Sequence, residues 1–80
     1  MKLKIKDLVT LDDNKQYVVV SKTDLEHKKY YYLVDMNNNE NVLFCYEDDD
    51  NLVQLDDENL IIKLLPLFLK EAKKIKINNI

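Results

Sequence analysis

The chain of 80 residues contains no glycine and no tryptophan, and it has one proline, one cysteine and one histidine. Its 12 basic residues are all lysine. Without glycine, the chain has no glycine-rich phosphate loop and no Asn-Gly type I′ hairpin turn. Without arginine, it cannot contact phosphate or guanine in a bidentate manner, although lysine can still act as a point charge. A single cysteine excludes an internal disulfide and favours a reducing compartment.

Long apolar runs are also missing, and none approaches the ~18 residues that a membrane-spanning helix needs. Residues 1–6 alternate lysine with apolar residues and lack the unbroken apolar stretch of a signal peptide. We therefore expect a cytoplasmic protein that does not associate with membranes. The abundance of lysine, asparagine, isoleucine and tyrosine fits an A+T-rich gene, which favours a low-GC bacterium or one of its phages.

Charge is distributed unevenly along the chain, although the formal net charge is only −3. Residues 7–58 carry 14 acidic residues against four lysines, whereas residues 59–80 carry five lysines against Glu71. Hydrophobic residues make up 46% of the chain, which is enough for a small core and too many for a disordered protein. We expect one domain, residues 1–80.

Residues 1–55 have the pattern of an antiparallel sheet. Short β-branched, aromatic or alternating segments recur at 3–11, 17–20, 29–34, 42–46 and 52–55. Short connections rich in Asp and Asn join them, which favours a β-meander of four or five strands. The two central strands are apolar on both faces, so the sheet either curls into a small SH3-like barrel or carries a helix on one face. The apolar phase slips at Asp7, where a bulge is expected.

Residues 56–75 predict a C-terminal helix, and residues 76–80 a tail, which gives an α+β fold. Asp56 is the expected N-cap, and acidic residues in the first turn suit the helix dipole, as do Lys70, Lys73 and Lys74 at the other end. An apolar stripe recurs at helical spacing at Ile61, Leu64, Leu65, Phe68 and Ala72. Pro66 lies inside this stripe and is expected to kink or split the helix.

Catalysis has one obvious candidate, the thiol of Cys45. A reactive thiol needs a base or a positive field nearby, and His27 falls in a predicted loop that nothing in the sequence places beside Cys45. A free cysteine in a strand is more often a small core residue. We therefore predict no enzymatic activity, no catalytic residue and no cofactor.

A calcium site is suggested by Glu47, Asp49, Asn51 and Glu58, which occupy positions one, three, five and twelve of an EF-hand window. Position six is Leu52, where an EF-hand needs glycine, and a strand rather than a helix is expected before the window. We interpret this segment as a charged turn and predict no metal site.

The tyrosines are the aromatic residues for which a binding role is the clearest alternative to a structural role. Tyr30 and Tyr32 lie on one side of their strand, with Tyr31 on the other. Their rings either pack on the sheet or form a partner-binding face. The candidate partner-binding residues are these tyrosines, a third tyrosine and the neighbouring acidic run: Tyr30, Tyr32, Tyr46, Glu47, Asp48, Asp49 and Asp50. Direct nucleic-acid binding is disfavoured because acidic residues flank the sheet and repel phosphate.

Two family resemblances fit this reading. Ile5 to Leu11 and Tyr17 to Val20 resemble the opening of small SH3-like barrels of the KOW type, in which an Asp precedes the first core strand and Tyr-x-Val follows the first turn. Lys6 stands where these barrels have glycine. A longer pattern over residues 7–69 resembles a family of short acidic bacterial proteins, the domain of unknown function 1292, through Leu11-Asp12, Tyr17 to Val19, Lys29 to Val34, Glu47 to Asp50 and Asp56 onward. That family has no assigned activity, so the resemblance implies architecture only.

Three functions remain open from the sequence. The first is a non-enzymatic module that binds a protein partner through its sheet face or its helix. The second is a mobile-element or phage inhibitor that imitates nucleic acid and occupies the basic groove of a nuclease, as anti-CRISPR proteins do. This hypothesis requires carboxylates in phosphate-like rows rather than scattered over the surface. The third is a homodimer formed through the uncovered sheet face or an edge strand.

Overall fold

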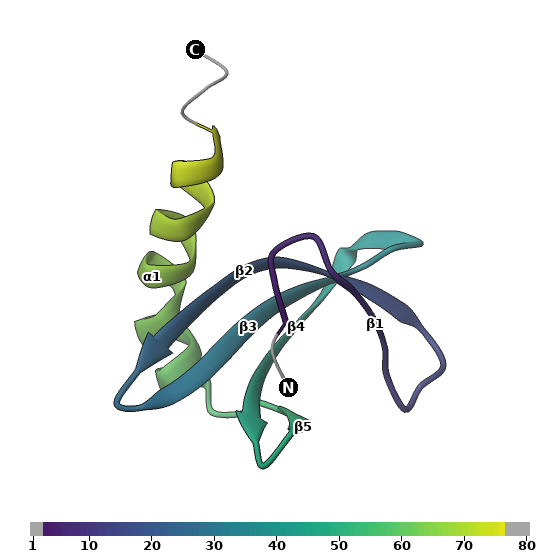
Figure 1. Ribbon diagram of the computed structural model, residues 1–80, viewed down its shortest axis with the longest axis horizontal. Coiled ribbons are helices and arrows are strands. Elements are labelled where there is room, and N and C mark those ends of the chain that lie inside the picture. The colour runs from purple at the N-terminus through teal and green to yellow at the C-terminus, as the bar shows by residue number, and fades with distance from the viewer. Residues whose placement is uncertain (1–2, 77–80) are drawn as a thin grey trace.

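The computed structural model describes residues 3–76, and the side chains of residues 3–70. The elements are β1 (Leu8–Thr10), β2 (Gln16–Leu25), β3 (Lys28–Asp35), β4 (Asn38–Asp48), β5 (Asn51–Gln54) and α1 (Glu58–Lys76). The strands form one antiparallel sheet in the order β1-β2-β3-β4-β5, curled into a half-barrel (Figure 1). The predicted α+β meander with one C-terminal helix is confirmed. Residues 77–80 of the expected tail lie outside the described residues.

Both faces of the central strands are apolar, as the sequence predicts. The pairs Tyr31–Cys45 and Leu33–Leu43 of β3 and β4 lie on the concave face. There a buried cluster forms from residues of three strands: Tyr17, Val19, Tyr31, Leu33 and Cys45. Adjacent pairs on β3 and β4 alternate to the opposite face, because successive side chains of a strand point to opposite sides.

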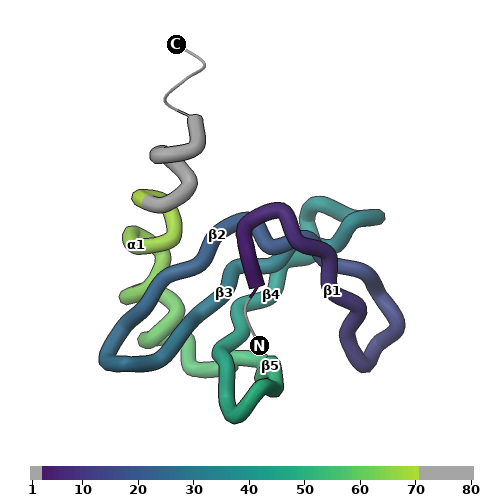
Figure 2. The backbone as a smooth tube through the Cα atoms, in the orientation of Figure 1, coloured from purple at the N-terminus to yellow at the C-terminus, as the bar shows by residue number. Residues whose placement is uncertain are grey.

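One end of the convex face, near the β2–β3 hairpin, is covered by α1 (Figures 1 and 2). Leu64 and Phe68 are fully buried there against Tyr30 and Leu55. The Oγ of Ser21 donates a hydrogen bond of 2.8 Å to the carbonyl of Phe68. Each fully buried Leu or Phe side chain stabilises the fold by about 1.5–3 kcal/mol, so these contacts fix the helix on the sheet.

A bulge in β2 places neighbouring buried residues of this strand on opposite faces of the sheet. Val19 pairs with Leu33, but the next pair is Ser21 with Tyr32, so Val20 is an extra residue. Val19 therefore faces the concave cluster, whereas Ser21 faces the helix. The bulge expected at Asp7 is present: the N–H of Lys6 donates to the carbonyl of Val19 at 2.7 Å and the N–H of Val19 donates to the carbonyl of Asp7 at 2.9 Å, so Lys6 and Asp7 both lie opposite Val19. The same segment closes a tight turn, in which the N–H of Asp7 donates to the carbonyl of Lys4 at 3.0 Å.

In two of the two-residue hairpin turns, both central residues have positive φ although neither is glycine. Glu26 and His27 have φ of 52° and 68°, and Asp49 and Asp50 have φ of 49° and 69°. Positive φ at both central residues is the geometry of a type I′ turn, which matches the twist of the flanking strands. The missing glycine therefore excluded the Asn-Gly sequence but not the turn.

The helix begins at a different cap from the one expected. The backbone N–H groups of Asn59 and Leu60 donate to Oδ1 of Asp57 at 3.1 and 3.2 Å, so Asp57 is the N-cap rather than Asp56. Pro66 does not split the helix. Its side chain is exposed, and the residue whose carbonyl loses its usual helical donor, Ile62, is itself 65% exposed.

Candidate binding cleft

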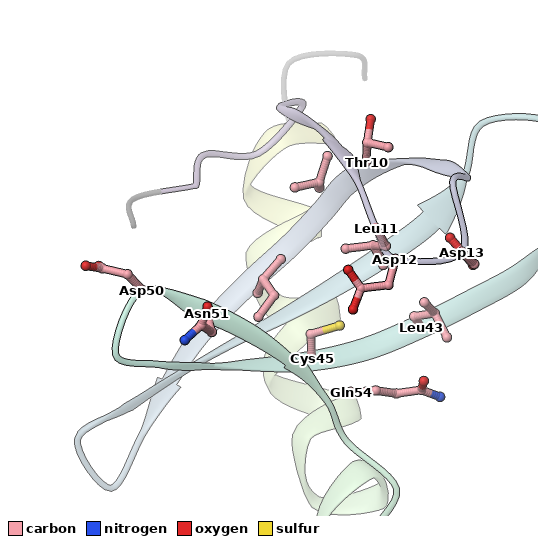
Figure 3. Close-up of a pocket in the computed structure, with 11 residues that line it drawn as sticks. Thr10, Leu11, Asp12, Asp13, Leu43, Cys45, Asp50, Asn51 and Gln54 are labelled. Atoms are coloured by element: carbon pink, nitrogen blue, oxygen red, sulfur yellow. The ribbon is translucent and has the colours of Figure 1, made fainter.

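The open side of the half-barrel is a cleft between its two edge strands. β1 and β5 are the two ends of the strand order and do not pair with each other. The cleft has a volume of about 460 Å³. Its walls come from β1 and the loop after it, and from β5 and the turn before it, with β4 at the floor (Figure 3). It joins segments about forty residues apart in the chain.

Both edge strands present backbone groups to this cleft. On the two sides of β1, the carbonyl of Asp7 accepts a hydrogen bond from the N–H of Val19, and the N–H of Leu11 donates one to the carbonyl of Lys15. Since hydrogen-bonded positions alternate along an antiparallel strand, the peptide groups of Leu8 and Thr10 point away from β2.

The same alternation determines which backbone N–H and C=O groups of β5 point away from β4. The N–H of Leu55 donates to the carbonyl of Phe44 at 2.7 Å. Leu52 and Gln54 are out of phase with Leu55, so their peptide groups point away from β4. Two short strand edges therefore border the cleft, each with N–H and C=O groups that no other described strand binds.

The floor of the cleft is apolar. Leu43 and Cys45 of β4 lie beneath Val9, Leu11 and Leu52. Cys45 is 2% exposed, and its sulfur is drawn within the cleft in Figure 3. Burial raises the pKa of the Cys45 thiol to about 11, so the group is protonated at neutral pH and is a weak nucleophile.

The histidine that a cysteine nucleophile would require is elsewhere. His27 is exposed at the tip of the β2–β3 turn, and it borders a separate depression with Glu47 and Asp49. Cys45 lies in the middle of β4 opposite Tyr31. The two residues are therefore not brought together.

The rim of the cleft is acidic. Asp12, Asp13 and Asp50 line it, and none of the 11 lining residues drawn in Figure 3 is basic. Asp13 is held in place because its Oδ1 accepts from the N–H of Lys15 at 2.9 Å and its Oδ2 from the hydroxyl of Tyr17 at 3.0 Å. Burial, followed by the bond to Asp13, raises the pKa of Tyr17.

A polar network behind Tyr17 supports this rim. The Nδ2 of Asn41 donates to the hydroxyl of Tyr17 at 3.3 Å and to Oδ2 of Asp35 at 3.1 Å. Asp35 is 5% exposed and also accepts from the N–H of Asn37 at 2.8 Å. The bonds from Asn37 and then Asn41 lower the pKa of Asp35, so the carboxylate stays charged inside the network.

The three tyrosines of the predicted partner-binding set lie on the helix side. Tyr30 is 7% exposed beneath α1, and the ring of Tyr32 lies 5.8 Å from that of Phe68. Tyr46 is half-buried, with the Nζ of Lys28 at 4.6 Å from its ring centre. These rings pack on the sheet and the helix. Of the two alternatives given for them, this is packing on the sheet.

The acidic run Glu47–Asp50 divides between two places. The hydroxyl of Tyr31 donates to Oε1 of Glu47 at 2.9 Å on the concave face. Burial and then this bond raise the pKa of Tyr31 to about 12. Asp48 ends β4 and Asp49 begins the turn, whereas Asp50 reaches the cleft.

The calcium window of the sequence does not form a ligand cluster. Asn51 uses its Nδ2 to donate to the carbonyl of Asp49 at 3.4 Å, and Glu58 is in the first turn of α1. Among the side chains that the structure describes, those of residues 3–70, no three Asp, Glu, His or Cys are grouped so that they could hold a metal ion.

Sequence reasoning missed most of the cleft. Its strand positions, such as Thr10 and Gln54, are ordinary polar residues, and only the curl of the sheet brings β1 and β5 together. A signal was present, since central strands that are apolar on both faces favour a curled sheet whose edges approach each other.

The chain was compared with known proteins. It matches no protein-family model, and searches of curated proteins and of solved structures found no match. Among the described residues, no helix has the length and the apolar composition that crossing a membrane requires.

Proposed function

We propose that this protein is a non-enzymatic binding module, of bacterial or phage origin and cytoplasmic, that holds an extended basic segment of a partner protein in the cleft between β1 and β5. One observation carries the proposal. Two strand edges with outward peptide groups border a single cleft that has an apolar floor and an acidic rim.

Backbone pairing would supply the affinity. An extended peptide that adds to a sheet edge gains main-chain hydrogen bonds, as in other proteins that bind peptides by β-augmentation. The outward groups of Thr10 on one side and of Leu52 and Gln54 on the other are the available partners. Such a strand would also cover edges that proteins otherwise protect from aggregation.

Side chains would supply the specificity. Successive residues of a bound strand point to opposite sides, so an apolar residue facing Leu43 and Cys45 would alternate with a residue facing the solvent and the rim. Lysine or arginine at the second kind of position would lie near Asp12 and Asp13. Opposite charge at the rim speeds association and selects the partner.

Nucleic-acid mimicry, the rival hypothesis, finds less support in the distribution of carboxylates. Asp12 and Asp13 lie in the β1–β2 loop, Asp24 and Glu26 at the β2–β3 hairpin, and Asp57 at the start of α1. The β1–β2 loop lies at one end of the sheet, and the β2–β3 hairpin and the start of α1 lie at the other (Figure 1). Scattered acids of this kind are what solubility alone would produce.

The proposal is tested with a display library of ten-residue peptides selected on the immobilised protein. We expect enrichment of segments that alternate lysine or arginine with β-branched residues and contain no proline. Asp12→Lys is expected to weaken binding of a selected peptide about tenfold, as loss of a complementary rim charge does. Asp24→Lys, an equal charge change in an exposed strand position away from the cleft, is the matched control and should leave the affinity within about twofold.

The opposite results would refute it. Selected peptides that are acidic or helical, or that bind Asp12→Lys as well as the native protein, would contradict the cleft as the site.

A further inference from the structure

The two strands that border the cleft run in the same direction within the sheet. Each of the four neighbouring pairs in the order β1-β2-β3-β4-β5 is antiparallel. The strand direction therefore reverses four times between β1 and β5 and returns to the original one. A strand placed between these two edges would be antiparallel to both or parallel to both, and it could not be antiparallel to one edge and parallel to the other.

The two edges also pack on the same buried cluster of the concave face. Val9 of β1 and Leu11 just after it contact this cluster, and so does Leu52 of β5. Residues of both edges line the one cleft. The outward peptide groups of β1 and β5 thus border a shared space, where a single strand would find donors and acceptors on both of its sides.

We infer that the bound segment pairs with β1 and β5 at the same time and runs antiparallel to both, which closes the half-barrel into a six-stranded antiparallel barrel. This inference rests on the proposed function, because it concerns the direction of the segment in the same cleft. Antiparallel pairing is slightly more stable per residue than parallel pairing, and every neighbouring pair of this sheet is already antiparallel. A closed barrel has no edge, so one short segment covers both edges.

Alternation along the bound segment assigns each of its residues to one edge and one face. The side chain of Leu52 points to the concave cluster, so a residue that pairs with the outward groups of Leu52 also points inward. The side chains of Leu8 and Thr10 are exposed, so a residue that pairs with their outward groups points to the solvent. Inward apolar residues therefore bond to β5, and the polar residues between them bond to β1.

The acidic rim then sets the order of residues in the segment. Asp12 and Asp13 follow the C-terminal end of β1, and Gln54 is the last residue of β5, whereas Asp50 precedes β5. An antiparallel segment begins at the C-terminal ends of both edges, where two of the three rim carboxylates lie. Its lysine or arginine residues must therefore precede its inward apolar residues. A parallel segment would need the opposite order.

Two capped peptides of identical composition test this direction. One has two lysines at its N-terminal end followed by alternating valine and threonine, and the other has the reversed sequence. Capping removes the charges of the peptide ends, which would otherwise differ. Isothermal titration calorimetry should show one peptide per protein, and the lysine-first peptide should bind roughly fivefold to tenfold more tightly, as two exposed ion pairs allow. Asp12→Lys should reduce this preference, and the control Asp24→Lys should preserve it.

A nitroxide label on either end of the lysine-first peptide reports the direction itself. At the N-terminal end it should broaden the NMR amide signals of Asp12 and Gln54 most, and at the C-terminal end those of Leu8 and Leu52. Equal affinities of the two peptides, the reversed broadening pattern or two peptides per protein would overturn the inference and leave the cleft as the binding site. Failure of both peptides to bind would overturn the inference and the proposed function together.

Discussion

Replacing Lys6 with glycine is expected to stabilise the protein. Lys6 has φ of 80° and occupies the third position of the turn from Lys4 to Asp7, where a type II turn requires positive φ. A residue with a Cβ costs roughly 1–2 kcal/mol in the left-handed region. Glycine removes that cost but loses more chain entropy on folding, about 0.5–1 kcal/mol.

The net gain is about 0.5–1 kcal/mol, which raises the Tm of a domain of this size by about 2–8 °C. Glycine keeps the N–H that Lys6 donates to the carbonyl of Val19 at 2.7 Å, and the lysine side chain is exposed, so little else changes. Lys4→Gly is the control, because φ of Lys4 is not positive, and it is expected to lower the Tm or leave it unchanged. Thermal unfolding followed by circular dichroism measures both. A Lys6→Gly protein no more stable than the native chain, or an equal gain from Lys4→Gly, would refute the reasoning.

Two further predictions concern single side chains. Asp57→Ala is expected to lower the free energy of unfolding in urea by about 1 kcal/mol through loss of the N-cap, whereas Asp56→Ala should change it much less; equal effects would contradict the assigned cap. Tyr31→Phe removes the bond to Glu47 and is expected to cost about 1 kcal/mol at neutral pH. Because the pKa of Tyr31 is raised from 10 to about 12 in the fold, the unfolded chain loses this proton first, so native stability falls as pH rises from about 10 towards 12. In Tyr31→Phe that alkaline decline should be smaller, and an unchanged decline would show that Tyr31 does not contribute to it.

The sheet and its order were predictable because local patterns specify them. Tyr17 to Val20 and Lys29 to Val34 are dense in β-branched and aromatic residues, and short polar connections leave an antiparallel meander as the simplest arrangement. The helix was predictable from apolar spacing, which identified Leu64 and Phe68 as part of its buried side. Leu65, which the same predicted stripe included, is instead 36% exposed, because it follows Leu64 by about 100° around the helix.

The details that failed depend on tertiary context. The bulge at Val20 lies in a continuous apolar run, so no change of pattern marks it. Asp56 and Asp57 are chemically equal as caps, and only the path of the chain after Leu55 decides between them. The cleft depends on the curl of the whole sheet, a property that no single segment encodes.

Lys6 connects a local backbone conformation with the tertiary arrangement of the cleft. The backbone of Lys6 has the left-handed conformation that glycine adopts most easily. The turn places β1, and hence one edge of the cleft, although the residue itself is unfavourable for it.

Hydrogen exchange of the edge amides, measured by NMR with and without a selected basic peptide, tests the binding cleft most directly. We predict that the amides of Thr10, Leu52 and Gln54 exchange rapidly in the free protein and that their exchange slows markedly when the peptide binds. Amides of α1 should not change. Peptide binding that leaves all three edge amides in fast exchange would contradict the claim that the open side of the half-barrel accepts a strand.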